Sequence, residues 1–172
     1  FNCPLCNALD NCTALTYIKF GNNFNQPLAN SLDNCTALTH IVFDVRFNQS
    51  LGNSLDNCTA LIHIVFGEDF NQKVDLPFSV RFLSLNSNNK YLVEHLPDSI
   101  EEIELGYGFN LELANLPSAI KKIKFNIFSE YNKELNCLPN GLEYLQLPIR
   151  YKLKIQNVPK RLKKIICSEK CQ

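Results

Sequence analysis

The sequence predicts an α/β-type repeat solenoid that is mostly β, and three observations predict it. The octapeptide Ser-Leu-Asp-Asn-Cys-Thr-Ala-Leu occurs at residues 31–38 and again at 54–61, and residues 9–15 match its last seven positions. A Leu-x-x-Ile-x-Phe motif begins at the last Leu of each of these copies, and Phe-Asn-Gln follows each motif after three intervening residues. Self-similarity at 20 to 30 residues is typical of a solenoid, in which each coil buries its apolar edge only against its neighbours.

Eight copies of the strand motif are expected, at residues 15–20, 38–43, 61–66, 80–85, 100–105, 120–125, 142–147 and 162–167. Their first residues are 23, 23, 19, 20, 20, 22 and 20 apart. We therefore predict one domain over residues 1–172, with long 23-residue repeats in 1–77 and shorter repeats in 78–172. In the shorter repeats a Leu-Pro or Val-Pro pair precedes each strand, where proline removes no ladder hydrogen bond.

Alternation within each strand assigns the two faces of the sheet. In residues 38–43, Ile41 and Phe43 should point inward, and His40 and Val42 outward. Parallel strands about 4.8 Å apart would then stack the phenylalanines at 20, 43 and 66, and those at 24, 47 and 70, into apolar columns. The Asn of each Phe-Asn pair is expected to form a parallel ladder that satisfies backbone groups where the chain leaves the sheet.

The outward side chains are the candidate protein-binding residues. Successive strands should present a partly aromatic stripe followed by charged residues, and the candidates are Tyr17, Lys19, His40, Val42, His63, Val65, Phe82, Glu102, Lys122 and Tyr144. Exposed aromatic and β-branched side chains in a row are typical of an interface core. Because Val and Tyr are also good strand formers, their presence has a purely structural explanation as well.

Charged residues face each other on the fifth and sixth strands. Residues 101, 102 and 104 are Glu, and residues 121, 122 and 124 are Lys. The favoured interpretation is cross-strand pairing that fixes the register, at a few tenths of a kcal/mol per exposed pair. The alternative is a charged rim that steers a partner.

Charge and hydropathy argue against nucleic acid and membrane as partners. Seventeen basic and seventeen acidic residues cancel, and the basic cluster at 160–164 is interpreted as a solvated terminal coil. No apolar stretch approaches the roughly 18 residues that span a bilayer.

The three Asn-Cys-Thr acceptor sequences at 11, 34 and 57 would place glycans on adjacent coils, where they would collide. This favours a reducing interior, and thus a cytoplasmic location.

Cysteine positions favour packing over chemistry. Cys12, Cys35 and Cys58 recur at the repeat period and are predicted to be small buried side chains in one column. Cys3 and Cys6 depart from the repeat, as do Cys167 and Cys171, so a local disulfide is possible at either end.

Catalytic motifs are lacking in the sequence, so we expect no enzyme activity and no cofactor. His40 and His63 occupy equivalent positions on adjacent strands, but a metal site would need at least one further donor. The favoured interpretation is that they are ordinary surface residues of the repeat.

The Phe-Gly-x-x-Phe-Asn-Gln-Pro-Leu segment at 20–28, its variants at 43–51 and 66–74, and Leu-Pro-x-Ser-Ile at 96–100 resemble the FNIP repeat. This family is related to the leucine-rich repeats, and its members are abundant in social amoebae and in giant viruses of amoebae. The resemblance is specific in residues 1–76 and thins where Asn89-Lys90 and Tyr151-Lys152 replace Phe-Asn. It implies a curved leucine-rich-repeat solenoid of about eight coils, with one parallel sheet on its concave face, that binds other proteins.

The resemblance also carries a functional implication. In viral members these repeats often follow an F-box, which links a bound target to a ubiquitin ligase, and residues 1–172 contain no F-box segment. A virus-encoded member would work in the host cytoplasm or in the virion. We therefore expect a non-enzymatic interaction scaffold, and the resemblance implies target recognition within an F-box adaptor as its more specific role.

The alternative is a structural or virion-associated protein that assembles through the ends of the solenoid. The chain has no Met and starts within a repeat at Phe1, as a processed chain or part of a longer one would. Such a start implies an apolar edge, which solenoids normally cap.

Overall fold

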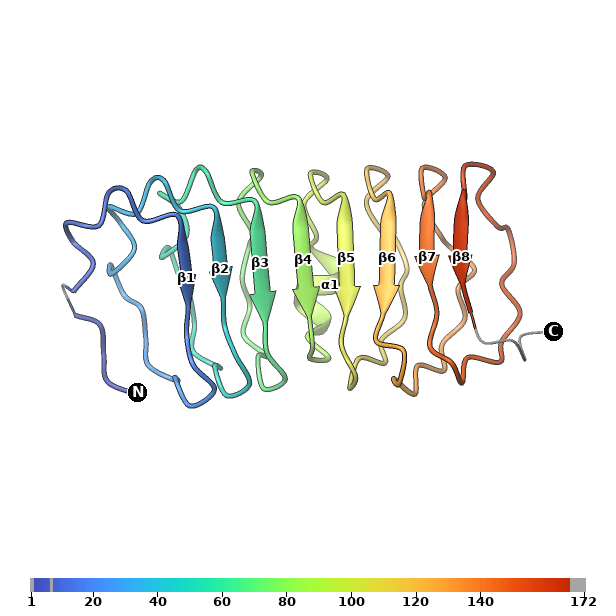
Figure 1. Ribbon diagram of the computed structural model, residues 1–172, viewed down its shortest axis with the longest axis horizontal. Coiled ribbons are helices and arrows are strands. Elements are labelled where there is room, and N and C mark those ends of the chain that lie inside the picture. The colour runs from blue at the N-terminus through green and yellow to red at the C-terminus, as the bar shows by residue number, and fades with distance from the viewer. Residues whose placement is uncertain (1, 7, 168–172) are drawn as a thin grey trace.

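The protein is a parallel β-solenoid of eight coils, which confirms the predicted fold class (Figure 1). The computed structural model describes residues 2–6 and 8–167. Each described coil contributes one strand, and the eight strands pair in chain order in one sheet. The strands are β1 Tyr17–Lys19, β2 His40–Val42, β3 His63–Phe66, β4 Phe82–Leu85, β5 Glu102–Leu105, β6 Lys122–Phe125, β7 Tyr144–Gln146 and β8 Lys164–Ile166.

Strand register follows the alternation in the sequence. Ile41 pairs with Ile64 across β2 and β3, and both are fully buried. Their neighbours His40 and Val42 are half-buried on the opposite face. The same alternation holds in β3 to β6, where every second side chain enters the core. The faces predicted from period-two alternation are therefore the observed ones.

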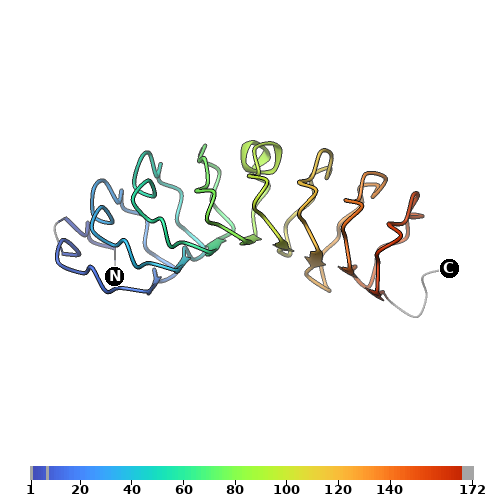
Figure 2. The same cartoon turned by 90° about the horizontal axis from the view of Figure 1, so that it is seen from above.

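The sheet lies on the concave side of the stack. Figure 2 shows the strands along the inner arc and the return segments spread along the outer arc. Strands are thinner than the loops and helix opposite them, so coils stacked in register fan out on the return side. Side chains that leave the sheet outward consequently point into the concavity.

Stacked aromatic rings form the core of the long repeats. Phe20, Phe43 and Phe66 follow one another at ring-centroid distances of 5.3 and 5.5 Å, nearly parallel. A second column holds the phenylalanines at 24, 47 and 70, at 6.1 Å per step. Both predicted columns are present, and their buried rings supply much of the apolar burial in the first three coils.

A ladder of asparagine amides joins successive coils at the turn away from the sheet. The side-chain Oδ1 of Asn25 accepts from the backbone N–H of Asn48 at 2.9 Å, and Asn48 does the same for Asn71. The ladder resumes later, where Asn88 accepts from the backbone N–H of Asn110 at 2.7 Å. These bonds satisfy backbone donors that no strand partner reaches, as expected for this Asn.

The fourth coil departs from the repeat in a way that the sequence did not predict. A short helix, α1 Lys90–Glu94, replaces the extended return segment and buries Leu92 and Val93. Asn89 caps it by accepting from the N–H of Leu92 at 3.0 Å. Asn88 occupies the ladder position in this coil. The alignment of Asn89-Lys90 with Phe-Asn, which placed Lys90 there, was therefore wrong.

Cysteine and proline occupy equivalent positions in the two kinds of repeat. The carbonyls of Cys35 and Cys58 accept from the N–H three residues later, at 3.0 Å, just before each strand. The carbonyls of Pro97 and Pro139 do the same, at 3.1 and 3.0 Å. Cys35 and Cys58 are fully buried, as predicted, while Cys12 in the first coil is half-buried.

A candidate protein-binding face

Two rows of side chains line the concave face, and strand pairing fixes both. The first row runs through Tyr17, His40, His63, Phe82, Glu102, Lys122, Tyr144 and Lys164, which are direct partners from strand to strand. The second row runs through Lys19, Val42, Val65, Ser84, Glu104, Lys124, Gln146 and Ile166. All ten candidate residues thus lie on one face, in the predicted order.

The first four members of the first row form what we call the aromatic column. Ring centroids of Tyr17 and His40 are 6.1 Å apart, those of His40 and His63 are 5.0 Å apart, and those of His63 and Phe82 are 3.8 Å apart. Tyr17 is 53% exposed, while the other three are half-buried. The column therefore offers three half-buried rings and one exposed tyrosine to the concavity.

The histidines of the aromatic column are electrostatically coupled. Burial lowers the pKa of His63 below its ordinary value, and the adjacent His40 lowers it further. Glu102 and Glu104, on the far side of Phe82, act in the opposite direction. At neutral pH the His63 side chain is consequently uncharged, which leaves an aromatic, partly apolar surface in the first half of the concave face.

A charge network begins where the aromatic column ends. Lys122 lies 2.9 Å from Glu102, and Lys124 contacts both Glu102, at 3.1 Å, and Glu104. Burial alone would raise the pKa of Glu102, but hydrogen bonds from the two lysines outweigh it and lower the pKa. The predicted cross-strand pairing is therefore present, and it fixes the register of β5 against β6.

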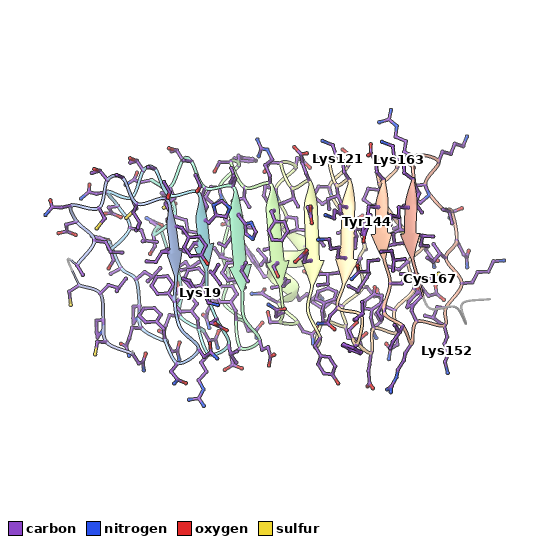
Figure 3. The ribbon with its side chains drawn as sticks, in the orientation of Figure 1. Lys19, Lys121, Tyr144, Lys152, Lys163 and Cys167 are labelled. Atoms are coloured by element: carbon purple, nitrogen blue, oxygen red, sulfur yellow. The ribbon has the colours of Figure 1, made fainter. Side chains whose placement is uncertain are left out.

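Tyr144 continues the first row between two lysines. The ammonium groups of Lys122 and Lys164 lie 5.4 and 5.7 Å from its ring centroid. Figure 3 shows Tyr144 in the second half of the sheet, near Lys121 and Lys163 at the upper edge. These two lysines pair with Glu101 and Glu143 at 2.6 and 2.8 Å. This half of the face is thus charged but largely internally compensated.

Metal ligation and disulfide formation are the two other kinds of chemistry that the His and Cys residues could carry. Within residues 2–6 and 8–167, no group of three or more His, Cys, Asp and Glu side chains is placed to hold a metal ion. Cys3 and Cys6 are exposed and carry free thiols, so the possible disulfide between them is absent. The other possible pair includes Cys171, which lies outside the described residues. No helix in the described part of the chain is long and apolar enough to cross a membrane.

Sequence reasoning missed two features near this face. Asn86, Gly106, Asn126 and Gln146 line a polar hollow at the carboxyl ends of β4 to β7. Beyond it, large apolar side chains occupy the corners of the turns, with Tyr107 60% and Phe128 62% exposed. From the sequence, an apolar residue two or three positions after a strand would be assigned to the core, so only the turn geometry reveals its exposure.

Comparison with known proteins agrees with the fold and with the predicted resemblance. The FNIP repeat model matches residues 88–128, in the half where the sequence signature is thinner. The chain is also similar to the giant-virus protein CroV588, whose crystal structure is described as a novel circular LRR protein structure. The TM-score is 0.72 at 28% identity, over 90% of this chain.

This chain spans only 24% of the length of CroV588, and no curated protein matches it in sequence. The match at residues 88–128 includes Phe109-Asn110 and the Leu-Pro pair at 116–117, which carry the family signature in this half. The chain is therefore a solenoid of the leucine-rich-repeat type that carries an FNIP repeat.

Proposed function

We propose that this protein is a non-enzymatic interaction scaffold that binds a partner protein on its concave face. The aromatic column is the observation that supports this most. Four rings in contact, partly exposed in a concavity, match the aromatic composition of interface centres, where a few buried anchors supply most of the affinity.

The remaining candidates would form the surroundings of that centre. Val42 and Val65 extend the apolar surface beside the histidines, and Lys19 borders it at β1, where it pairs with Asp44 at 3.5 Å. Glu102, Lys122 and Tyr144 would form the charged part of the interface. Because these charges are already paired within the sheet, we expect them to affect association rate and salt dependence more than affinity.

Alanine substitution of the column tests this proposal. A Tyr17→Ala/Phe82→Ala variant should remain folded and lose about thirtyfold or more in affinity for a partner captured from amoebal lysate. Phe78→Ala is the matched control, because Phe78 is 79% exposed and lies before β4 rather than in either concave row. If the column variant retains its partner while Glu102→Lys abolishes binding, the working surface is the charged half instead.

The F-box adaptor role would use the same surface for target recognition. It adds a requirement for a ligase-binding segment, so its test is separate. Co-purification of the intact gene product with ubiquitin-ligase subunits would support this role, and their absence would leave a scaffold of another kind.

Self-association through the outermost strands is a second candidate. Ile165 and Ile166 of β8 are 46% and 36% exposed, whereas Leu145, the partner of Ile165 on β7, is fully buried. An open strand edge beside apolar side chains is a typical pairing surface. Light scattering over a hundredfold concentration range tests self-association. A molecular mass that rises with concentration would support it, and a constant monomer mass would rule this candidate out.

A further inference from the structure

Two histidines lie side by side within the aromatic column. His40 and His63 are direct partners in the register of β2 and β3, and their ring centroids are 5.0 Å apart with 35° between the ring planes. Imidazole nitrogens bind a metal ion at about 2.1 Å, so an ion shared by two rings at a roughly tetrahedral angle places their centroids about 5 Å apart. The strands therefore hold the two rings at the separation that a shared ion requires.

A chain of hydrogen bonds fixes the tautomer of neutral His40. The hydroxyl oxygen of Thr39 lies 2.8 Å from the backbone oxygen of Thr16 and 2.8 Å from Nδ1 of His40. A carbonyl oxygen can only accept, so the single hydroxyl proton is donated to Thr16. The Thr39 oxygen must then accept a hydrogen bond from His40, whose Nδ1 carries the ring proton. The Nε2 of neutral His40 is therefore left with its lone pair.

This support matches what metal-binding histidines have in proteins. Such a histidine usually donates its second ring N–H to a fixed acceptor, which orients the ring and makes the ligating nitrogen more basic. At His40 the acceptor is the Thr39 hydroxyl, which is itself held by the Thr16 carbonyl of the neighbouring coil. The ring of His40 is thus oriented by its surroundings before any ion arrives.

The second histidine is held in its neutral form. Burial is the main cause that lowers the pKa of His63, and the adjacent His40 lowers it further. A neutral imidazole has one unprotonated nitrogen in either tautomer, and a metal ion that binds it displaces no proton. Phe82 packs against the other side of the ring, at a centroid distance of 3.8 Å. The ring of His63 is therefore confined between Phe82 and His40.

The charged neighbours of the pair are compatible with a bound cation. Lys19 on β1 is paired with Asp44 at 3.5 Å. On the other side of the pair, Glu102 and Glu104 favour a positive charge at His63. Both glutamates are also paired with lysines of β6, which moderates their effect. These neighbours therefore favour a bound cation rather than oppose it.

We propose that His40 and His63 form a two-histidine binding site for a divalent transition-metal ion, with Thr39 as its positioning residue. Imidazole suits Cu(II), Ni(II) and Zn(II), whereas Mg²⁺ and Ca²⁺ prefer oxygen ligands. Two protein ligands leave at least two coordination positions open toward the concavity, where water supplies the further donors. This inference goes beyond the proposed function and does not depend on a protein partner.

Electron paramagnetic resonance with Cu(II) tests the proposal, because nitrogen ligands split the copper signal. Accessible thiols are first alkylated with iodoacetamide, since exposed cysteines such as Cys3 and Cys6 would also bind copper. One equivalent of Cu(II) at pH 7 should then give the spectrum of two-nitrogen coordination. His40→Gln and His63→Gln should each lose it, whereas His95→Gln, outside the column, should retain it. An unchanged spectrum in either column variant would overturn the proposal.

Calorimetric titration of the alkylated protein with Cu(II) tests the positioning residue. Thr39→Val keeps the branched shape but removes the hydroxyl, and it should weaken binding about tenfold. Thr39→Ser should restore the affinity. Ile62→Val is the matched control, because Ile62 precedes His63 as Thr39 precedes His40 and has no hydroxyl. Equal affinities of Thr39→Val and the unsubstituted protein would refute the assigned role of Thr39.

Urea unfolding with Ni(II) gives a readout on the unsubstituted protein itself. An ion that bridges β2 and β3 binds the folded chain only, so excess Ni(II) should raise the urea midpoint of the alkylated protein. His63→Gln should show no such rise, and its midpoint without metal verifies that this variant is folded. No rise in the unsubstituted protein, or an equal rise in both, would overturn the two-histidine site.

Discussion

At the residue scale, one repeat position shows how closely neighbouring coils approach. Gly21 and Gly67 both follow the last Phe of a strand motif, 46 positions apart in the sequence. A Cβ on Gly67 would lie 2.2 Å from the backbone oxygen of Asp44 in the preceding coil. The same atom on Gly21 would meet nothing within 4 Å. The requirement for glycine therefore comes from the neighbouring coil and not from the turn itself.

We expect Gly67→Ala to destabilise the protein by about 2 kcal/mol or more, because the clash is with backbone that can move only by displacing the second coil. Gly21→Ala should change the free energy of unfolding by less than about 0.5 kcal/mol. Urea midpoints of the two variants provide the comparison. Equal midpoints would show that the second and third coils are less tightly packed than the structure indicates.

The lowered pKa of His63 predicts a pH dependence of stability. Folded His63 binds a proton less readily than unfolded His63, whose pKa lies near 6.5. Stability is therefore complete above pH 6.5 and falls as the pH decreases toward the folded pKa. Burial and His40 cause this effect, and Glu102 and Glu104 partly oppose it.

Urea titrations at pH 7.5 and pH 5.5 measure this dependence. The unsubstituted protein should be less stable at pH 5.5, and His63→Phe should narrow the difference, since Phe occupies the next position of the same column at residue 82. His95→Gln, outside the column, is the control and should leave the difference in place. Greater stability at pH 5.5 than at pH 7.5 would contradict the assigned direction.

At the scale of the element, the asparagine ladder links neighbouring coils at the turn where the chain leaves the sheet, beside the side-chain contacts of the strands. The Oδ1 of Asn48 accepts from the N–H of Asn71 at 2.9 Å and from the side-chain amide of Gln72 at 3.1 Å. One amide oxygen thus serves two donors of the next coil. Beyond Asn71 the ladder gives way to the α1 coil, where Asn89 donates to the carbonyl of Gln72 at 2.8 Å instead.

Asn48→Ala should therefore cost about 1–2 kcal/mol, because two donors of the third coil lose their acceptor. Asn48→Asp keeps the acceptor oxygen and should retain most of the stability. Asn71→Ala is the control, since the Asn71 side chain is exposed and the substitution leaves the backbone bond to Asn48 intact. Denaturation of the three variants under identical conditions ranks them, and an equal loss for Asn48→Ala and Asn71→Ala would contradict the ladder's contribution.

The regular part of the architecture could be predicted because the sequence repeats it. Residues one period apart, such as His40 and His63, must occupy equivalent positions, and strand pairing in register brings them to 5.0 Å. The helix α1 could not be predicted in the same way. It has only five residues, too few for a helical period to be recognised, and its cap Asn89 was aligned with the Phe of the Phe-Asn pair instead.

The candidate binding face was predictable to a lesser degree than the strands that carry it. Alternation identified which side chains enter the concavity, but it gave no information on ring contacts such as the 3.8 Å approach of His63 and Phe82. The exposed apolar side chains at the corners of the turns were missed for a different reason. Ile127 and Phe128 have the composition of core residues, and only the turn bond from Ser129 to Asn126 shows that both lie at a corner.

At the scale of the whole molecule, stability is a property of neighbouring coils rather than of one central core. Each strand contacts only the strand before it and the strand after it. Ile64, Leu83 and Ile123 on inner strands are fully buried, whereas Ile165 on β8 is 46% exposed. In such a one-dimensional stack, opening from an end breaks one interface, while opening in the middle breaks two.

Amide hydrogen exchange of the 172-residue chain should reflect this difference. We expect the slowest exchange in β3 to β6 and faster exchange in β1 and β8, because the outer strands can open without disturbing the rest. A difference of about tenfold in protection corresponds to about 1.4 kcal/mol, which is less than the loss of one buried interface would imply. Mass spectrometry of peptic peptides over minutes to hours measures it. Uniform protection from β1 to β8 would mean that the eight coils unfold as one cooperative unit. The stacked core phenylalanines and the asparagine ladder would then couple the ends to the centre more strongly than nearest-neighbour contacts allow.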